Sequence, residues 1–287
     1  MNLSDLPDEL IDGLRVRAAR PVSGGDIARA YRLDTPDGSL FLKWRPEATP
    51  DLFEREAVGL RALRAHRGRE LHVPEVLRES RSGLVLEWIE SGPAAPSTEA
   101  DLGRGLAQLH RTTGDYFGSL DSSLSGYLGS AEVDLTPTAD WPAFFVERRV
   151  IPLIDRGIGL GVVPQGARVL IDRLAPRADE LCGPPESPAL VHGDLWAGNR
   201  MIGAGGRNWL IDPAAYWAHR EIDLAMMSLF GGFGPDCFAA YDEAFPLADG
   251  WRDRLRWYQL PPLLVHAILF GGGYGAAALD VLRRYAR

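Results

Sequence analysis

The spacing of apolar residues divides the chain into a front part with extended patterns and a longer rear part with helical periodicity. Apolar residues recur at helical spacing over 3–14 and predict a short opening helix. A second, amphipathic helix is predicted over 51–63. Extended patterns predict strands at 16–22, 30–33, 40–44, 73–77 and 84–88. The first 90 residues therefore predict a mostly antiparallel sheet with one helix.

A stretch rich in Gly, Pro and Ser at 91–97 has the composition of a link between lobes. Beyond it, one short β-like segment at 190–211 interrupts a helical pattern. Helices are predicted over 99–112, 141–155, 166–181, 222–230, 235–244 and 252–269. We therefore predict an α+β protein with two lobes: residues 1–90 form a small sheet lobe, and residues 91–287 form a larger, mainly helical lobe.

Composition and charge exclude several classes of protein. Of 287 residues, 46% are hydrophobic and 24% charged, which is ordinary for a folded chain and argues against disorder. The net charge is −8 and the arginines are scattered, so a nucleic acid has no basic surface on which to dock. The longest apolar stretch, 260–270, contains two prolines and a histidine and is too short to span a membrane.

Cysteine usage and the start of the chain bear on the compartment. Cys182 and Cys237 are too few for a disulfide framework, which favours a reducing compartment, and we expect both to be buried. The first residues lack a basic segment followed by an apolar run, so no secretory signal is predicted. We expect a cytoplasmic protein. The sequence leaves its oligomeric state open.

The strongest chemical signal lies between residues 190 and 213. Asp194 and Asn199 are separated by four residues, a spacing that matches the catalytic loop of protein kinases. There the Asp accepts the proton of the attacking hydroxyl, and the Asn holds Mg²⁺. Asp212 follows an apolar run and supplies a second hard oxygen ligand for Mg²⁺. The pattern predicts phosphoryl transfer, although Asp and Asn are also common turn residues.

A second set upstream supports this interpretation. Lys43 ends an apolar strand, and Glu56 lies on the helix that follows. In kinases a strand lysine reaches the nucleotide phosphates and a helix glutamate holds it. Glu54 is the competing partner on another face of the helix, and we favour Glu56. The Gly24-Gly25 turn could cover phosphates, because glycines let backbone N–H groups approach closely, but a two-glycine turn is more often only a hairpin.

Three further positions complete the expected site. The segment Glu87-Trp88-Ile89, just before the linker, lies where backbone groups would bind adenine. His192 is expected to organise its loop through hydrogen bonds rather than act as a base. Gly193 occupies the position of the protein-kinase arginine that pairs with a phosphorylated activation loop, and the segment after Asp212 is short. A small-molecule acceptor is therefore favoured over a protein one.

Over nearly its whole length the chain resembles the fructosamine kinases, or ketosamine-3-kinases. These belong to the protein-kinase-like superfamily, with the aminoglycoside phosphotransferases and choline kinases. The tryptophan in the catalytic loop is most telling, because the wider superfamily usually lacks it. The resemblance is carried by His192-Gly193-Asp194-Leu195-Trp196, the run from Asp212 to Ala225, Phe230-Gly231-Gly232-Phe233 and Leu269-Phe270-Gly271-Gly272.

The resemblance implies a protein-kinase-like bilobal fold and ATP-dependent phosphorylation of the 3-hydroxyl of a ketosugar joined to an amine. It implies ATP and Mg²⁺, and a role in protein deglycation, since the 3-phosphate of a glycated protein is unstable. It assigns the base to Asp194, metal binding to Asn199 and Asp212, and phosphate binding to Lys43 with Glu56. Candidate sugar contacts are Trp196 and, more weakly, Trp141 and Trp217, for which packing is the competing interpretation.

Some details and alternatives stay open. Family members with a cysteine in the glycine turn form redox-sensitive dimers, but this chain has Asp26 there, which argues against such a switch. Asp223 is expected to cap a helix or pair with Arg220. One alternative function is an aminoglycoside or choline phosphotransferase, which would share these residues. Another is an ATP-binding pseudokinase, which has no reason to retain Lys43, Glu56, Asp194, Asn199 and Asp212 together.

Overall fold

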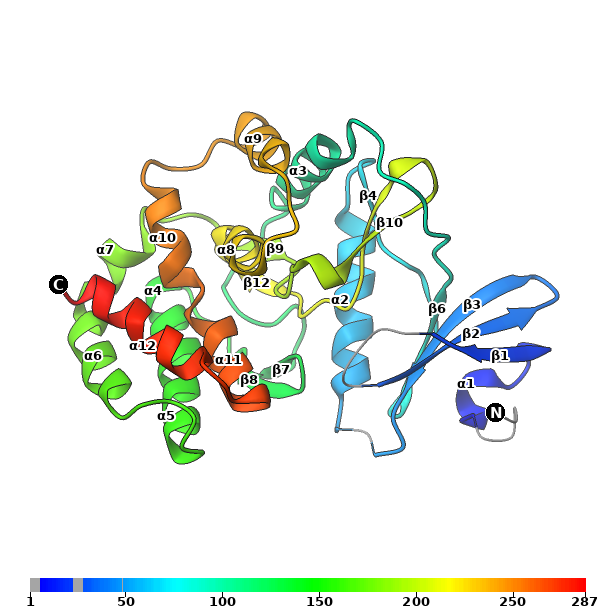
Figure 1. The fold of residues 1–287 in the computed structure, drawn as a ribbon, viewed down its shortest axis with the longest axis horizontal. Helices are drawn as coiled ribbons and strands as arrows, with labels where there is room; N and C mark the ends of the chain where they lie inside the picture. Colours follow the sequence, from blue (N-terminus) through cyan, green and yellow to red (C-terminus); the bar gives the residue numbers. More distant parts are fainter. Residues whose placement is uncertain (1–5, 23–27, 48) are drawn as a thin grey trace.

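The computed structural model describes residues 6–22, 28–47 and 49–287. Its front part is a five-stranded antiparallel sheet, drawn in blue to cyan on the right of Figure 1. The strand order is β1 (Ala18–Pro21), β2 (Arg29–Thr35), β3 (Gly38–Trp44), β6 (Gly83–Glu87) and β5 (Val76–Ser80). The predicted small antiparallel sheet lobe is confirmed.

One helix lies between this sheet and the rest of the molecule. Helix α2 (Leu52–His66) turns its apolar residues, among them Phe53 and Leu60, into a core shared with the second part of the chain. Figure 1 shows α2 running along the boundary between the sheet and the helices. The short α1 (Asp8–Ile11) covers the sheet on another side, with Leu10 fully buried against Leu33 and Val85. Helix α2 therefore connects the two lobes.

Three small sheets shape the centre of the molecule. The strand β4 (Leu71–His72) pairs in parallel with β11 (Asn208–Leu210), which pairs antiparallel with β10 (Arg200–Ile202). Residues far apart in the sequence thus share a sheet. The others are antiparallel pairs: β9 (Ala189–Val191) with β12 (Tyr216–Ala218), and the hairpin of β7 (Ser125–Leu128) and β8 (Ala131–Asp134).

Helices make up most of the second lobe, on the left of Figure 1. They pack around one large apolar core. A single helical stretch from 141 to 159 changes type along its length: α4 (Trp141–Ala143), a π-helical segment (Phe144–Val150) and α5 (Ile151–Gly159). The other α-helices are α3 (Thr98–Leu109), α6 (Gly166–Leu174), α7 (Ala178–Cys182), α8 (Glu221–Phe230), α9 (Pro235–Ala244), α10 (Trp251–Tyr258), α11 (Leu260–Phe270) and α12 (Tyr274–Tyr285).

The structure corrects several element boundaries. The strand predicted at 73–77 begins only at Val76, because Pro74 has no N–H for a sheet ladder. The helix predicted over 252–269 is two helices that meet at Gln259, where Pro261 and Pro262 open the second one. The hairpin at 125–134 and helix α12 were not predicted. Both lie in segments where short apolar runs and glycines obscure the periodicity.

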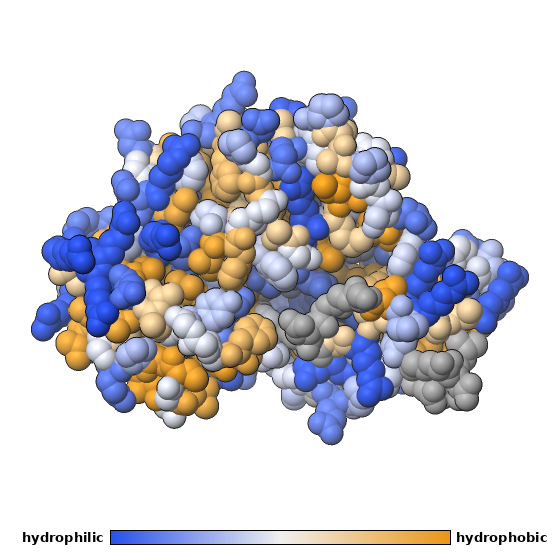
Figure 2. All heavy atoms as spheres, in the orientation of Figure 1, coloured by the Kyte–Doolittle hydropathy of each residue, from blue (hydrophilic) through white to orange (hydrophobic). Residues whose placement is uncertain are grey.

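The described part of the chain has an exposed apolar area and two buried cysteines. On the face shown in Figure 2, apolar side chains gather at the lower left over α5, where Leu160 is exposed. No helix among the described residues is long and apolar enough to cross a membrane. Cys182 and Cys237 are both buried and free of disulfides, as predicted.

Candidate active site

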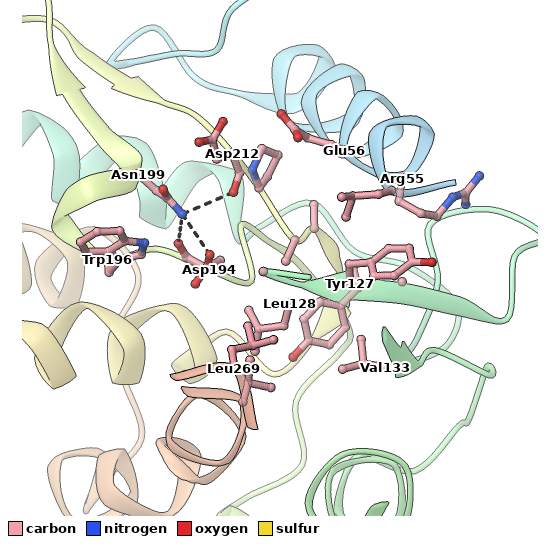
Figure 3. Close-up of a pocket in the computed structure, with 18 of the residues that line it drawn as sticks. Arg55, Glu56, Tyr127, Leu128, Val133, Asp194, Trp196, Asn199, Asp212 and Leu269 are labelled. Atoms are coloured by element: carbon pink, nitrogen blue, oxygen red, sulfur yellow. Dashed lines mark hydrogen bonds between the residues drawn. The ribbon is translucent and has the colours of Figure 1, made fainter. Parts of the chain in front are cut away.

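Three oxygen-bearing side chains converge where the short strands end. Asp194 follows β9, Asn199 closes a 3₁₀ turn (Ala197–Asn199), and Asp212 follows β11. The Asn199 amide nitrogen donates to the backbone carbonyl of Asp194 at 2.9 Å and to its carboxylate at 3.1 Å. The same nitrogen lies 3.4 Å from the carbonyl of Asp212. Figure 3 shows the three side chains facing one space. The structure thus brings together the residues that the spacing singled out.

The Asp223 carboxylate binds the backbone just before Asp194 through hydrogen bonds. This carboxylate, on α8, accepts from the N–H groups of His192 and Gly193 at 2.7 and 2.8 Å. Gly193 has a φ of +80°, and a side chain there would collide with the carbonyl of Ala214. The loop can take this shape only with glycine at 193 and an acceptor below it.

His192 has the organising role that was predicted. It is fully buried, its Nδ1 accepts from the N–H of Asp194, and its Nε2 lies 3.0 Å from the carbonyl of Ile211. Nε2 therefore carries the proton. Burial lowers the pKa of His192 and keeps the ring neutral. The ring joins the base loop to the strand that leads to Asp212.

Asp223 differs from what was expected of it. It neither caps α8 nor pairs with Arg220, whose guanidinium binds Glu186 at 2.7 and 2.9 Å. Instead His110, the residue that follows α3, lies 3.1 Å from the Asp223 carboxylate, and the other ring nitrogen of His110 contacts the Tyr241 hydroxyl. Sequence reasoning missed the contributions of Asp223 and His110 to the site. An acidic residue in the first turn of a mainly apolar helix was the only available signal.

The lysine of β3 reaches this group from the sheet lobe. Lys43 Nζ lies 2.5 Å from Glu56 on α2 and 2.8 Å from Asp212. The structure therefore selects Glu56 over Glu54. Burial disfavours the charged form of Lys43, but Asp212 and Glu56 outweigh this and raise its pKa. The lysine is a fixed cation at the boundary between the lobes.

The two neighbouring carboxylic acids are perturbed by burial. Burial raises the pKa of Asp194 to about 8, with Asp212 and Asp223 adding to the effect and Asn199 opposing it. Burial also raises the pKa of Glu56 to about 7, against the attraction of Lys43. Groups with strongly shifted pKa values in a cavity are typical of catalytic sites. Asp194 combines such a shift with an open path to the cavity.

These residues line a single cavity of about 590 Å³. Lys43, Glu56, Asp194, Asn199 and Asp212 occupy one side of it. Leu128 and Val133 of the hairpin and Leu269 of α11 form an apolar wall on another side, as Figure 3 shows. The hairpin, absent from the predicted elements, therefore builds part of the site.

The three candidate tryptophans have different positions. Trp196 is 41% exposed and lines the cavity beside Asp194. Trp141 is buried in the core, where its indole nitrogen donates to the Tyr258 hydroxyl at 3.0 Å. Trp217 packs over Gly114 against a second core. Neither of the latter two lines the cavity, and packing accounts for both rings, so the structure gives no support to their assignment as sugar contacts.

The remaining predicted residues concern the nucleotide. Gly24 and Gly25 lie outside the described residues. Glu87 ends β6 and its carboxylate accepts from the backbone N–H of Glu75. Trp88 and Ile89 follow the strand, and their backbone groups make no hydrogen bond among the described residues. Neither of the two residues nor Glu87 is among those that line the cavity, so their assignment to adenine stays a prediction.

Similarity to known proteins extends over nearly the whole chain. A family model described as fructosamine kinase matches residues 4–287. A protein of Enterococcus faecium named as a ketoamine kinase is 36% identical over 273 residues, covering 92% of this chain and 94% of that protein. A chloroplastic protein-ribulosamine 3-kinase of Arabidopsis thaliana is 32% identical over 274 residues, covering 93% of this chain and 82% of that protein.

Solved structures agree with this. A crystal structure titled as a fructosamine-3-kinase, from Thermobifida fusca, has a TM-score of 0.87 at 37% identity and covers 96% of this chain and 95% of that one. A spectinomycin phosphotransferase with bound ADP has a TM-score of 0.56 at 14% identity and covers 95% of this chain and 90% of that one. This similarity is one of fold alone. The predicted protein-kinase-like α+β fold is confirmed.

Proposed function

Since this chain belongs to the fructosamine kinase family, we propose that it transfers the γ-phosphoryl group of ATP to the 3-hydroxyl of a ketosugar joined to an amine. One observation carries the proposal. Asp194, Asn199 and Asp212 face the same cavity as the Lys43–Glu56 ion pair. Phosphoryl transfer requires mainly positioning and neutralisation of charge, and these side chains supply both.

Asp194 is the base that accepts the proton of the attacking hydroxyl. Its carboxylate is oriented by the Asn199 amide, and its backbone is fixed through His192. A base held in this way accepts the proton as the oxygen attacks phosphorus, and it contributes a rate factor of roughly 10² to 10⁴. Neutral His192 does not compete for the proton, because both of its ring nitrogens have partners.

Asn199 and Asp212 fit Mg²⁺. The Asn199 nitrogen is used in bonds to Asp194, which leaves its amide oxygen free of donors among the described residues. The Asp212 side chain is 41% exposed, and only one of its oxygens binds Lys43. No cluster of three His, Cys, Asp or Glu able to hold a metal exists in the described part of the chain, so nucleotide phosphates and water would complete the shell. When bound, Mg²⁺ neutralises charge on the phosphates.

The nucleotide would lie between residues 1–90 and residues 91–287. Lys43, held by Glu56, binds its phosphates as a fixed cation. The free backbone groups of Trp88 and Ile89 suit the adenine edge. Gly24 and Gly25 are proposed to cover the phosphates from the β1–β2 turn. The lobe boundary at residues 90 and 91 then coincides with the adenine-binding segment.

The acceptor is a ketosamine, such as a fructosyl or ribulosyl amine, either free or on a glycated protein. Support comes from the relatives named as a ketoamine kinase and a protein-ribulosamine 3-kinase. Trp196 presents an exposed indole beside the base, a surface suited to the C–H face of a sugar. Two free, buried cysteines suit a reducing compartment, and we propose the cytoplasm.

Product analysis tests the proposal directly. The purified chain is incubated with Mg²⁺-ATP and fructosyl- or ribulosyl-lysine, and the product is examined by mass spectrometry and phosphorus NMR. A phosphate ester on O3 is expected. Asp194→Asn is the control, and it should abolish transfer while binding of Mg²⁺-ATP persists. Phosphorylation of choline or an aminoglycoside in place of every ketosamine tested would refute the proposal, as would ATP binding with no transfer to any acceptor.

A further inference from the structure

Arg149 is a buried cation that has no charged partner among residues 6–22, 28–47 and 49–287. Only 3% of its surface is exposed, yet it lines the cavity that holds Asp194. Its Nε and Nη1 are buried and have no hydrogen-bond partner, and within the described ranges no carboxylate lies within 4.0 Å of its guanidinium. Burial of a charge with unmet donors costs several kcal/mol in general. A ligand with oxygen acceptors would remove much of this cost.

Local contacts explain how Arg149 is held but not why its donors are free. The guanidinium carbon lies 4.9 Å from the ring centre of Tyr216 on β12, a cation–π contact worth about 0.5 to 2 kcal/mol. That ring in turn lies against Gly193, next to the base. The contact with Tyr216 holds the guanidinium in place, while its Nε and Nη1 stay without hydrogen-bond partners in the described part of the chain. Arg149 therefore brings unpaired donors to the wall of the cavity that holds Asp194.

The backbone that carries Arg149 is itself unusual. Arg149 lies in the π-helical segment Phe144–Val150, which contacts β8 and α11. Pro152 has no N–H to donate, and its ring would collide with the carbonyl of Arg148 in a regular α-helix. The wider π-helical turn before it relieves this conflict. Such segments are rare and frequently occur at functional sites.

Depth within the cavity indicates which part of a ketosamine meets Arg149. The aromatic residues Trp196, Phe230 and Phe270 also line the cavity but are 41%, 38% and 56% exposed, so they mark its mouth. An amine substituent as large as a protein lysine must leave through the mouth. The sugar then enters with the end farthest from the amine first. In this orientation the hydroxyls beyond the acceptor carbon would lie toward the buried guanidinium.

We infer that Arg149 is a specificity-determining residue that binds the hydroxyl oxygens of the sugar tail, beyond the 3-hydroxyl, through its unpartnered N–H edge. The inference rests on the proposed function and deepens it, because it states how the enzyme recognises the length of the ketose. A planar fork of donors matches two neighbouring hydroxyl oxygens better than a point charge does. The kinase thereby favours ketoses with hydroxyls at C4 and C5.

The test compares two substrates that differ only in the sugar tail. Ribulosyl-lysine carries hydroxyls at C4 and C5, whereas erythrulosyl-lysine ends at C4. We expect Arg149→Met to lower kcat/KM for ribulosyl-lysine by roughly 10- to 100-fold, the range for a lost hydrogen bond to a charged group. For erythrulosyl-lysine the loss should be much smaller, so that the preference of the wild-type enzyme for the longer sugar disappears.

Arg148→Met is the matched control, because Arg148 is the neighbouring residue and binds Asp134 at the surface at 3.0 Å. Arg148→Met should leave kcat/KM unchanged for both substrates. Arg149→Lys keeps the charge and most of the volume, and serves if Arg149→Met fails to fold. It should lose part of the activity on ribulosyl-lysine and little on the shorter substrate.

Three results would overturn the inference. One is an equal loss for both sugars together with a lower melting temperature, which indicates a packing role. Another is a loss that vanishes when ribulosyl-cadaverine replaces ribulosyl-lysine, which indicates that Arg149 binds the amino-acid carboxylate. The third is an active Arg149→Met enzyme in which the ratio of kcat/KM for ribulosyl-lysine to kcat/KM for erythrulosyl-lysine equals that of the wild type. This result contradicts the inference about Arg149 and leaves the proposed function intact. A wild-type enzyme inactive on every ketosamine would instead contradict the proposed function.

Discussion

The Asp223 carboxylate of α8 accepts a hydrogen bond from the backbone N–H of Gly193 at 2.8 Å. Its second oxygen accepts from the N–H of His192 at 2.7 Å. The residue immediately after Gly193 is the proposed base. A helix that starts 27 residues after Asp194 therefore fixes the backbone on which the base is mounted.

Replacing Asp223 by Asn should impair both folding and catalysis. Asn has a single acceptor oxygen, so its NH₂ group would face one of the two backbone donors. We expect the free energy of unfolding to fall by roughly 2 to 4 kcal/mol and kcat to fall at least about 10-fold. Denaturant unfolding and steady-state kinetics measure the two effects. Asp280→Asn, at an exposed pair with Arg283, is the control, and full kcat in Asp223→Asn would contradict the assigned role.

Glu56 and Glu54 can be distinguished by the affinity for ATP. Glu56 lies 2.5 Å from Lys43, whereas Glu54 has no ion pair among the residues that the structure describes. Glu56→Gln removes the charge that holds the lysine toward the phosphates. We expect KM for ATP to rise by about 10-fold, equivalent to roughly 1.4 kcal/mol. Glu54→Gln should leave KM unchanged, and equal effects of the two substitutions would refute the pairing as the cause.

Substitution of Trp196 should change KM for the sugar, whereas substitution of Trp141 should change stability. Trp196 is exposed at the cavity, so Trp196→Ala should raise KM for the ketosamine several-fold while stability changes by less than about 1 kcal/mol. Trp141 is buried among Phe144, Phe145 and Tyr258, so its truncation should cost about 3 to 5 kcal/mol. Thermal unfolding and kinetics on the folded fraction separate the effects. A change in sugar KM for Trp141→Phe, with Trp196→Ala silent, would reverse the assignment.

His219 should make the stability depend on pH. Burial lowers its pKa to about 4, from an ordinary value of 6.5. Between these values the unfolded chain binds a proton that the folded chain does not. Stability from this group is therefore fully present above pH 6.5 and is lost as the pH falls toward 4, by up to about 3 kcal/mol.

Denaturant unfolding at several pH values between 7.5 and 4.5 measures this loss. His219→Gln should unfold more easily at pH 7.5, because the ring stacks on Tyr258, and its deficit in stability relative to the wild type should shrink as the pH drops. Identical slopes in the two proteins would show that His219 does not titrate as described. Glu56 and Asp194, whose raised pKa values add stability as the pH falls through this range, are unchanged in the variant, so the difference between the two slopes reports on His219.

Local spacing was enough to predict the proposed base and metal ligands. Asp194 and Asn199 lie on one loop, and Asp212 follows a strand directly joined to it, so their proximity depends on short segments whose residue types are visible in the sequence. The sheet of the first lobe was equally accessible, because alternating apolar residues specify strands that pair with near neighbours along the chain.

Tertiary packing decided the rest. Asp223 meets His110, which is 113 residues earlier, and Lys43 selects Glu56 while also contacting Asp212, which is 169 residues later. Nothing in the sequence distinguishes Arg149 from Arg148, yet Arg149 is buried with no carboxylate partner in the described ranges, whereas Arg148 binds Asp134 at the surface. Periodicity reports which face of an element is buried. Which buried polar groups meet, and which stay unpaired, depends on how distant elements dock.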